Sequence, residues 1–361
     1  MNTFHTDEPS PLVLPSPLFW HDRPVLVTGG TSFIGSTLVD ALIDLGAKVR
    51  VIDNMSSGRI QNIQHLLKAG TIEFFEDDLR SEQALKRACQ GIDTLFHLAA
   101  AHGGRGYVDL HQADCANNLL LDGMVFDAAL KYGVRKVVFA SSGCIYPLHI
   151  QTETTQKLYL TEDLAGPPYN ADGMYGWAKL MGEMTLRTLH QERGLDAVSC
   201  RYFTVYGPRA LENHAIIAMM ARALTRQNPF EIWGDGSQVR NWTYITDIVA
   251  GTLLAGEKIN DGTAINLGTS ERITVLEAAT MILKLANHDA PFEFQPHMPT
   301  GPMNRIASFE RAQNLLGWRP RMPFAKGVVE TFEWYRQNRD FNEVKSKLDE
   351  LLLERGTTIT L

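Results

Sequence analysis

The chain has 361 residues, of which 44% are hydrophobic and 21% charged, and its formal net charge is -7. This length and apolar share predict one large or two coupled globular domains. The acidic balance argues against a nucleic-acid-binding surface, which needs a clustered basic face, and no apolar run approaches the roughly 18 residues of a membrane span.

The cysteine pattern and the first 20 residues predict the compartment. Cys89, Cys115, Cys144 and Cys200 show neither close pairing nor metal-ligand spacing, which favours reduced thiols and no metal site. Residues 1–20 carry no Lys or Arg and are rich in Pro and Ser, so they predict a loosely held arm rather than a signal peptide. We therefore expect a soluble cytoplasmic protein that binds neither membranes nor nucleic acids.

The first regular segment is a strand, a glycine turn and a helix. Residues 25–27 are apolar, the turn spans residues 28–35, and Leu38 and Leu42 fall on one side of the following helix. The glycines let the backbone approach a pyrophosphate, and the helix N-terminus adds N–H groups and a partial positive charge. The middle position of this fingerprint is Ser32, so a pyrophosphate must tolerate its β-carbon or gain a hydroxyl contact.

The next strand ends in a carboxylate that predicts the cofactor. Residues 49–52 lead into Asp53, eighteen residues after Gly35. A carboxylate there accepts both ribose hydroxyls of the adenosine and repels a 2′-phosphate, so NAD is expected rather than NADP. The alternative is a tight turn that binds no nucleotide. The expected cofactor-binding residues are Gly29, Ser32, Phe33, Ile34, Gly35, Asp53, Asn54, Asp78, Leu79, Ala99, Tyr175 and Lys179.

Strands and helices alternate through the next part of the chain. Apolar runs at residues 72–75 and 94–100 enclose a helical pattern at residues 81–90. This alternation predicts an α/β fold with a doubly wound parallel sheet. His97 lies inside an apolar run, which favours a hydrogen-bonded core histidine. The glycine-rich residues 103–107 follow a strand end, where a ligand loop is expected, although a flexible connection is the alternative.

The stretch 141–147 places a hydroxyl and a thiol at the end of a buried strand. Ser142 suits proton relay at an alcohol or ketone, and Cys144 suits acid or base chemistry at carbon unless it is only a small buried residue. Tyr175 and Lys179 are four residues apart and share one helix face. The ammonium can hold a cofactor ribose and lower the pKa of the phenol, which predicts Tyr175 as a general base.

Together these features resemble the extended short-chain dehydrogenase/reductase family, in particular its nucleotide-sugar epimerases and dehydratases. The resemblance runs from Pro24 to about Trp334 and implies a Rossmann sheet with a smaller α/β substrate-binding domain. Besides the glycine turn, Ser142, Tyr175 and Lys179, the resemblance rests on residues 201–209, 233–236, Arg240 with 244–247, and 266–268.

Within this family, residues 103–107 and 141–147 are similar to GDP-mannose 3,5-epimerase and GDP-fucose synthase. Those enzymes use a cysteine at the position of Cys144 with a second acid/base after the Tyr-Gly-Pro motif, which implies His214 as its partner. A surface or capping histidine is the alternative for His214. His214 resembles GDP-fucose synthase, whereas Asp53 disagrees with the NADPH that GDP-fucose synthase uses.

The resemblance also implies substrate contacts and an assembly. The expected substrate-binding residues are Gly104, Arg105, Thr204, Arg209, Arg240 and Arg305, with Arg240, Arg209 and Arg305 gripping the diphosphate of a nucleotide sugar. Thr204 stands where relatives usually have Asn. A homodimer is expected through helices at residues 113–132 and 174–194. The expected parts are an arm at 1–20, a Rossmann domain at 21–202 plus about 239–268, a substrate-binding domain at 203–238 and 269–345, and a tail at 346–361.

The expected activity is C3/C5 epimerisation of a GDP-hexose through a transient 4-ketone, with bound NAD and no net redox change. Ser142, Tyr175 and Lys179 would serve the hydride step, and Cys144 and His214 would exchange protons at carbon. Three alternatives remain open. They are a 4-epimerase that needs only the Ser, Tyr and Lys, a 4-keto-sugar epimerase/reductase, and a non-catalytic nucleotide-sensing or RNA-binding member of the fold.

Overall fold

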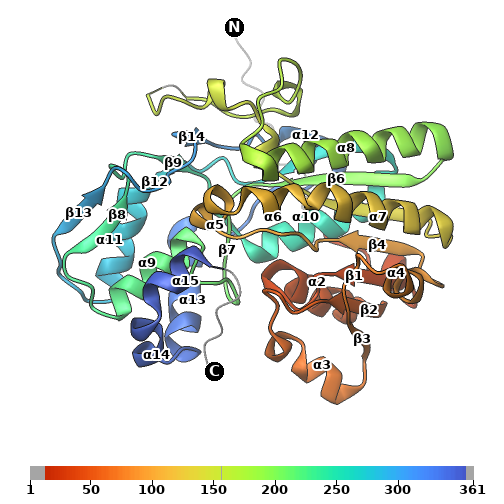
Figure 1. Ribbon diagram of the computed structural model, residues 1–361, viewed down its shortest axis with the longest axis horizontal. Helices are drawn as coiled ribbons and strands as arrows, with labels where there is room; N and C mark the ends of the chain where they lie inside the picture. Colours follow the sequence, from red (N-terminus) through yellow and green to blue (C-terminus); the bar gives the residue numbers. More distant parts are fainter. Residues whose placement is uncertain (1–12, 156, 355–361) are drawn as a thin grey trace, which may run out of the picture.

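The computed structural model describes residues 13–155 and 157–354, and its centre is a seven-stranded parallel sheet. The strands lie in the order β11-β6-β5-β4-β1-β2-β3 (Figure 1). Their bounds are β1 Pro24–Thr28, β2 Lys48–Asp53, β3 Ile72–Glu76, β4 Thr94–His97, β5 Lys136–Ser142, β6 Asp196–Tyr202 and β11 Asp261–Leu267. The strand order reverses between β1 and β4, which is where doubly wound sheets bind ligands. The predicted fold class is confirmed.

Helices cover both faces of this sheet because alternate residues of each strand point to opposite sides. On β1, Val25 and Val27 pack with α2 and α10, whereas Leu26 packs with α4 and α7. Figure 1 shows α2 and α10 on one side of the strands and α7 and α8 on the other. The helices of this part are α2 Phe33–Asp44, α3 Gln64–Ala69, α4 Glu82–Cys89, α5 Arg105–Leu110, α6 Gln112–Ala116, α7 Asn118–Lys131, α8 Gly173–Arg193 and α10 Ile245–Lys258.

The helix predicted over residues 113–132 is two helices, α6 and α7, which meet at Asn117. The next residue, Asn118, begins α7 and contacts the loop after β4. The amide of Asn118 donates to the carbonyl of Ala101 at 3.0 Å and accepts from its N–H at 2.7 Å. Asn118 thus fixes the loop that follows β4. Short 3-10 turns are η1 Ile60–Asn62, η2 Gly143–Ile145, η3 Leu148–Ile150 and η4 Glu162–Leu164.

A smaller part, on the left in Figure 1, stands beside the carboxyl ends of the strands. Its strand β8 pairs with β13, and β9 pairs with β12 and β14. Strand β9 lies just past the predicted boundary at residue 238. The remaining strands are β7 Val205–Tyr206, β8 Phe230–Trp233, β9 Val239–Arg240, β10 Thr243–Tyr244, β12 Ile273–Thr274, β13 Phe292–Gln295 and β14 Asn304–Arg305. The remaining helices are α9 Ala215–Leu224, α11 Val275–Leu285, α12 Glu310–Leu316, α13 Phe324–Gln337, α14 Phe341–Ser346 and α15 Leu348–Leu353.

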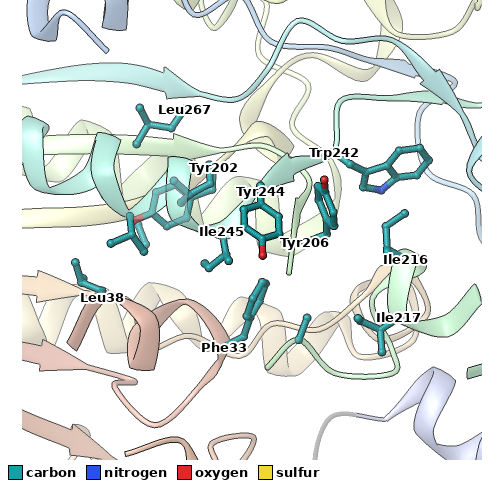
Figure 2. Close-up of a cluster of buried hydrophobic side chains, with 14 of the residues drawn as sticks. Phe33, Leu38, Tyr202, Tyr206, Ile216, Ile217, Trp242, Tyr244, Ile245 and Leu267 are labelled. Atoms are coloured by element: carbon teal, nitrogen blue, oxygen red, sulfur yellow. The ribbon is translucent and has the colours of Figure 1, made fainter. Parts of the chain in front are cut away.

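One apolar cluster continues from the large sheet into the smaller part (Figure 2). Tyr206 and Trp242 both pack on Phe324, with ring centroids 5.4 and 5.2 Å away. The Tyr202 and Thr252 hydroxyls hydrogen-bond at 2.9 Å inside the cluster. Figure 2 shows Phe33, Leu38, Tyr202, Tyr206, Ile216, Ile217, Trp242, Tyr244, Ile245 and Leu267 in this cluster. Because the two parts share a core, the space between them has a fixed shape.

The ends of the described chain dock on the body. Helix α1, Pro17–Trp20, buries Trp20 fully, and its indole N–H donates to the Glu257 carboxylate at 2.7 Å. Residues 1–12 of the predicted arm and residues 355–361 of the predicted tail lie outside the described residues. Within residues 13–155 and 157–354, no helix combines the length and apolar character needed to cross a membrane.

Candidate active site

Two cavities adjoin at the carboxyl ends of the strands. One, of about 380 Å³, lies between the sheet and the smaller part, and the other, of about 290 Å³, lies over the ends of β1, β2 and β4. The first cavity is lined by Ser142, Cys144, Tyr175, Lys179, Thr204 and His214, with Gly104, Arg105, Arg240 and Arg305. The second is lined by Gly29, Ser32, Asp53, Asn54, Asp78, Leu79 and Ala99. The fold therefore brings together most of the residues proposed from the sequence.

The glycine turn packs the start of α2 tightly against the end of β1. A β-carbon at Gly35 would lie 2.1 Å from the carbonyl oxygen of Gly29, so only glycine fits there. The Ser32 hydroxyl donates to that same carbonyl at 2.5 Å. Ser32 thus braces the turn, and the N-terminus of α2 faces both cavities, as a pyrophosphate site requires.

Asp53 is held in place by the turn that it faces. One carboxylate oxygen accepts from the Thr31 N–H at 3.1 Å and the Thr31 hydroxyl at 2.6 Å, and the other accepts from the Met55 N–H at 3.0 Å. The residue is 8% exposed and borders the smaller cavity. A carboxylate oxygen can accept two hydrogen bonds, so the Asp53 oxygen that accepts from Met55 keeps capacity for a ribose hydroxyl. At the same rim, the hydrogen bond from Arg80 lowers the pKa of Asp78 to about 2.

Tyr175 lies at the first turn of α8, beside the end of β5. Burial and then the neighbouring Cys144 raise the pKa of its phenol well above 10, while a hydrogen bond with Ser142 lowers it. This direction is opposite to the expectation that Lys179 lowers the pKa of the phenol. Burial has the largest effect on the Tyr175 pKa, and the Lys179 ammonium lies 5.9 Å from the centre of the Tyr175 ring.

Lys179 is a buried ammonium with spare donors. Its side chain is 1% exposed, and Nζ lies 3.9 Å from the Asp122 carboxylate. Among the described residues Nζ has no hydrogen-bond partner, and burial lowers the pKa of Lys179. An orphaned buried donor at a cavity wall fits a ribose hydroxyl. His97 is a core histidine, fully buried between the Thr28 hydroxyl at 2.8 Å and Asp122 at 3.0 Å.

His214 caps the N-terminus of α9 and reaches the cavity from the smaller part. Its ring is enclosed by Phe33 and His102, with centroids 6.2 and 5.8 Å away. Burial lowers the pKa of His214 to about 4, so the imidazole is neutral near pH 7 and can accept a proton.

His102 was missed from the sequence. It lines the same cavity, and its ring centroid lies 4.7 Å from that of Tyr175. The sequence feature that could have identified His102 is its position in the loop after β4, immediately before the glycine-rich residues 103–107. The loop itself is fixed by close packing, since a β-carbon at Gly104 would lie 1.5 Å from the carbonyl oxygen of Asn213.

The arginines proposed as substrate ligands differ in their contacts. Arg240 faces the cavity, and within the described part of the chain it donates only to backbone carbonyls, those of Val239 at 2.9 Å and Thr300 at 2.7 Å. Arg209 is not among the cavity-lining residues and lies 2.7 Å from the carboxylate of Asp40 on α2. Arg105 and Arg305 line the cavity, and both donate to the carboxylate of Asp172.

The far end of the large cavity holds further polar side chains that the sequence analysis missed. Arg222 is 4% exposed, and its Nε and Nη2 have no hydrogen-bond partner among the described residues. Its Nη2 lies 3.9 Å from the Glu231 carboxylate, and its guanidinium lies 5.7 Å from the Trp233 ring centre. The Gln238 side-chain oxygen is likewise unpartnered. No signal in the sequence distinguished these residues from core or surface positions.

Comparison with known proteins gives consistent matches. The model of the NAD dependent epimerase/dehydratase family matches residues 25–268. GDP-mannose 3,5-epimerase of Arabidopsis thaliana is 31% identical over 76% of this chain and 73% of its own length. UDP-glucose 4-epimerase of Mycolicibacterium smegmatis is 32% identical over 86% and 98%. The structure of UDP-glucuronic acid 4-epimerase from Bacillus cereus, with UDP-glucuronic acid and NAD, superposes with a TM-score of 0.78 at 29% identity, covering 87% of this chain and 99% of that one.

Proposed function

Because this chain belongs to the NAD-dependent epimerase/dehydratase family, we propose that it epimerises C3 and C5 of a GDP-hexose through a transient 4-ketone. NAD is its cofactor. One observation carries the choice of reaction. A thiol, Cys144, and a neutral imidazole, His214, line the same cavity as Ser142, Tyr175 and Lys179. A 4-epimerase needs only the latter three groups.

The first step is oxidation at C4. NAD would supply the acceptor for the hydride from that carbon. Tyr175, in its phenolate form, takes the hydroxyl proton, and the Ser142 hydroxyl donates a hydrogen bond to the C4 oxygen. The unpartnered ammonium of Lys179 holds a ribose hydroxyl and supplies positive charge when the phenol is deprotonated.

The second step is proton exchange at carbon. The ketone acidifies the hydrogens on C3 and C5, because the electron pair left on carbon delocalises into an enolate. Ser142 and Tyr175 stabilise its oxygen. Cys144 enters the cavity from the end of β5, and His214 enters it from the start of α9. One group, in its basic form, removes a proton from one face, and the other, in its protonated form, returns a proton to the opposite face.

We propose that the smaller part is the substrate-binding domain and that it binds a guanine nucleotide. Arg222 offers buried, unpartnered donors, and the Glu231 carboxylate nearby is 37% exposed. Guanine presents O6 and N7 as acceptors and an amino group as donor, which this pair complements. Arg240, whose hydrogen bonds go only to neutral carbonyls, is the proposed diphosphate ligand.

The reaction is tested by incubating the enzyme with GDP-mannose, UDP-glucose and UDP-glucuronic acid in heavy water, followed by NMR. Deuterium at C3 or C5 of the GDP-sugar is expected, and Cys144→Ser should reduce its incorporation at least about 100-fold. A control experiment measures NAD binding by the variant, which should be unchanged. C4 inversion of a UDP-sugar without solvent deuterium would overturn the proposal in favour of the simpler 4-epimerase.

We also propose a cytoplasmic homodimer. All four cysteines are free thiols, as expected in a reducing compartment. Leu119 and Leu120 on α7 and Met181 on α8 are 43%, 57% and 45% exposed, and α7 packs against α8. Two copies of this helix pair would cover these side chains in a four-helix bundle. Light scattering should give twice the 40.3 kDa chain mass, and Leu120→Glu with Met181→Glu should give the single chain.

A further inference from the structure

The contacts of Arg305 differ from those expected of a diphosphate ligand. This arginine, on β14, is 7% exposed and directs its three guanidinium nitrogens at three different side chains. Nε donates to the Gln151 side-chain oxygen at 2.9 Å, Nη2 to the Asp172 carboxylate at 3.0 Å, and Nη1 to the sulfur of Cys144 at 3.2 Å. Gln151 and Asp172 therefore hold two edges of the planar guanidinium, and its third edge faces the Cys144 thiol.

Resting on the proposed function, we propose that Arg305 is a positioning residue for Cys144. Its guanidinium holds the sulfur at the cavity wall and stabilises the thiolate whenever Cys144 has given up its proton. Asp172 and Gln151 fix the guanidinium for this task. In the epimerisation step, the C–H bond breaks, the proton joins the thiolate sulfur as an S–H bond, and the electron pair of the C–H bond enters the enolate.

Asp172 connects the contact between Arg305 and Cys144 to α8, the helix that carries Tyr175 and Lys179. It is the N-cap residue of α8, a position where an aspartate side chain ordinarily accepts from the helix N–H groups, but it makes no such cap here. One of its oxygens instead accepts from Arg305 at 3.0 Å and from Arg105 at 2.8 Å. Asp172 also donates its backbone N–H to the carbonyl of Cys144 at 2.8 Å.

Positive charges outnumber negative ones around the thiol. Arg105, Arg240 and Arg305 carry three positive charges, and Asp109 and Asp172 carry two negative charges in direct contact with Arg105 and Arg305. Burial, then Arg305 and Arg105, lower the pKa of Arg240 to about 9, whereas Asp172 and Cys144 raise it. The neighbouring phenol of Tyr175 on α8 is neutral at rest because burial raises its pKa.

The test measures the reactivity of the resting enzyme, so it does not depend on turnover. Iodoacetamide, a neutral probe, and iodoacetate, an anionic one, both alkylate a thiolate with loss of iodide. Labelling of Cys144 is followed by peptide mass spectrometry at about pH 7.5. Arg305→Gln should slow the reaction with iodoacetamide about tenfold and reduce the preference for iodoacetate. Arg305→Lys, which keeps the charge, should stay within about threefold of the wild type.

Controls separate this role from a merely structural one. Arg336→Gln removes an exposed arginine on α13 that pairs with Glu333 at 2.7 Å, and it should leave both rates unchanged. NAD binding reports on the integrity of the Arg305 variants. Equal labelling of Arg305→Gln and the wild type, or equal loss in the Gln and Lys variants, would overturn the inference. Arg305-dependent labelling without solvent deuterium in any sugar would sustain it and contradict the proposed reaction instead.

Discussion

The carbonyl oxygen of Cys144 lies so close to Gly176 that a β-carbon added at Gly176 would approach it to 2.3 Å. The same oxygen accepts the backbone N–H of Asp172 at 2.8 Å. These two contacts press the first turn of α8 against the end of β5. The phenol of Tyr175 and the thiol of Cys144 are therefore set relative to each other by main-chain packing.

Replacing Gly176 by Ala should push α8 away from the strand end and misplace Tyr175. A displacement of about 1 Å at a catalytic group lowers turnover about 100-fold, and overpacking costs about 1–3 kcal/mol of stability. Steady-state kinetics and chemical unfolding measure the two effects. The matched control is Gly166→Ala, where the nearest atom to the added carbon, the carbonyl oxygen of Asp163, lies at an ordinary contact distance of 3.5 Å, so turnover and stability should change little. Equal behaviour of the two variants would refute the argument.

Asp53→Ala should relax the discrimination between NAD and NADP. The change removes the acceptor for the ribose hydroxyls and the repulsion of a 2′-phosphate. NAD affinity should fall about tenfold and NADP affinity should rise, both measurable by calorimetry. Thr31→Val removes the hydroxyl that donates to Asp53 at 2.6 Å but keeps the carboxylate. It should weaken NAD binding without improving NADP binding. A variant at Asp53 that still rejects NADP would contradict the assigned role.

His214 should make the protein less stable as the pH falls. Its pKa is about 4 when folded against an ordinary value of about 6.5, so the unfolded chain binds the proton first. Stability is then lost progressively from about pH 6.5 toward pH 4. Between pH 7.5 and pH 5.0 this loss amounts to about 2 kcal/mol, which His214→Asn should remove. Urea unfolding at both pH values measures it, and identical losses in both proteins would count against a neutral buried imidazole.

Asp93 should contribute to acid stability at the opposite end of the sheet. Burial alone would raise the pKa of Asp93, but hydrogen bonds from Arg135, Thr94 and Arg23 together lower it to about 2. A lowered carboxylate pKa stabilises the fold above about pH 3.8, and this contribution is lost as the pH falls through 2. Because Asp93 is partly exposed and solvent screens its ion pairs, Asp93→Asn should cost about 1 kcal/mol at pH 7 and only a small part of that near pH 2. The exposed Asp44, changed to Asn, is the control and should cost little at either pH.

Local patterns could predict the fold class and NAD as the cofactor, and most of the residues expected to hold NAD line adjoining cavities. The glycine turn, Asp53 and the Tyr175 and Lys179 spacing each depend on a few neighbouring residues, and strand alternation predicted the doubly wound sheet. The contact between His102 and Tyr175 was out of reach, because it joins the loop after β4 to α8 across the fold. The same holds for Arg305, whose assignment as a phosphate ligand from the family resemblance could not include the Cys144 sulfur 161 residues away.

The burial of individual side chains is the second property that could not be predicted from the sequence. The raised pKa of Tyr175 follows from the enclosure of its ring by elements that come together only in the folded chain. Likewise, Arg222 resembles any arginine on an amphipathic helix until its donors prove to be buried and unpartnered. Residues whose chemistry depends on the absence of water were therefore the ones that pattern analysis missed.

The last described helix, α15, forms part of the wall of the large cavity. Leu352 lines the large cavity, Gly106 of the glycine-rich loop packs against Leu352 and Leu353, and the carbonyl of Glu354 accepts from the Asn213 amide at 3.0 Å. None of the proposed proton-transfer groups lies on this helix. Varying Leu352, the residue of α15 that lines the cavity, would therefore change which nucleotide sugars fit while leaving the proposed chemistry encoded elsewhere, which makes this position the natural starting point for engineering substrate range.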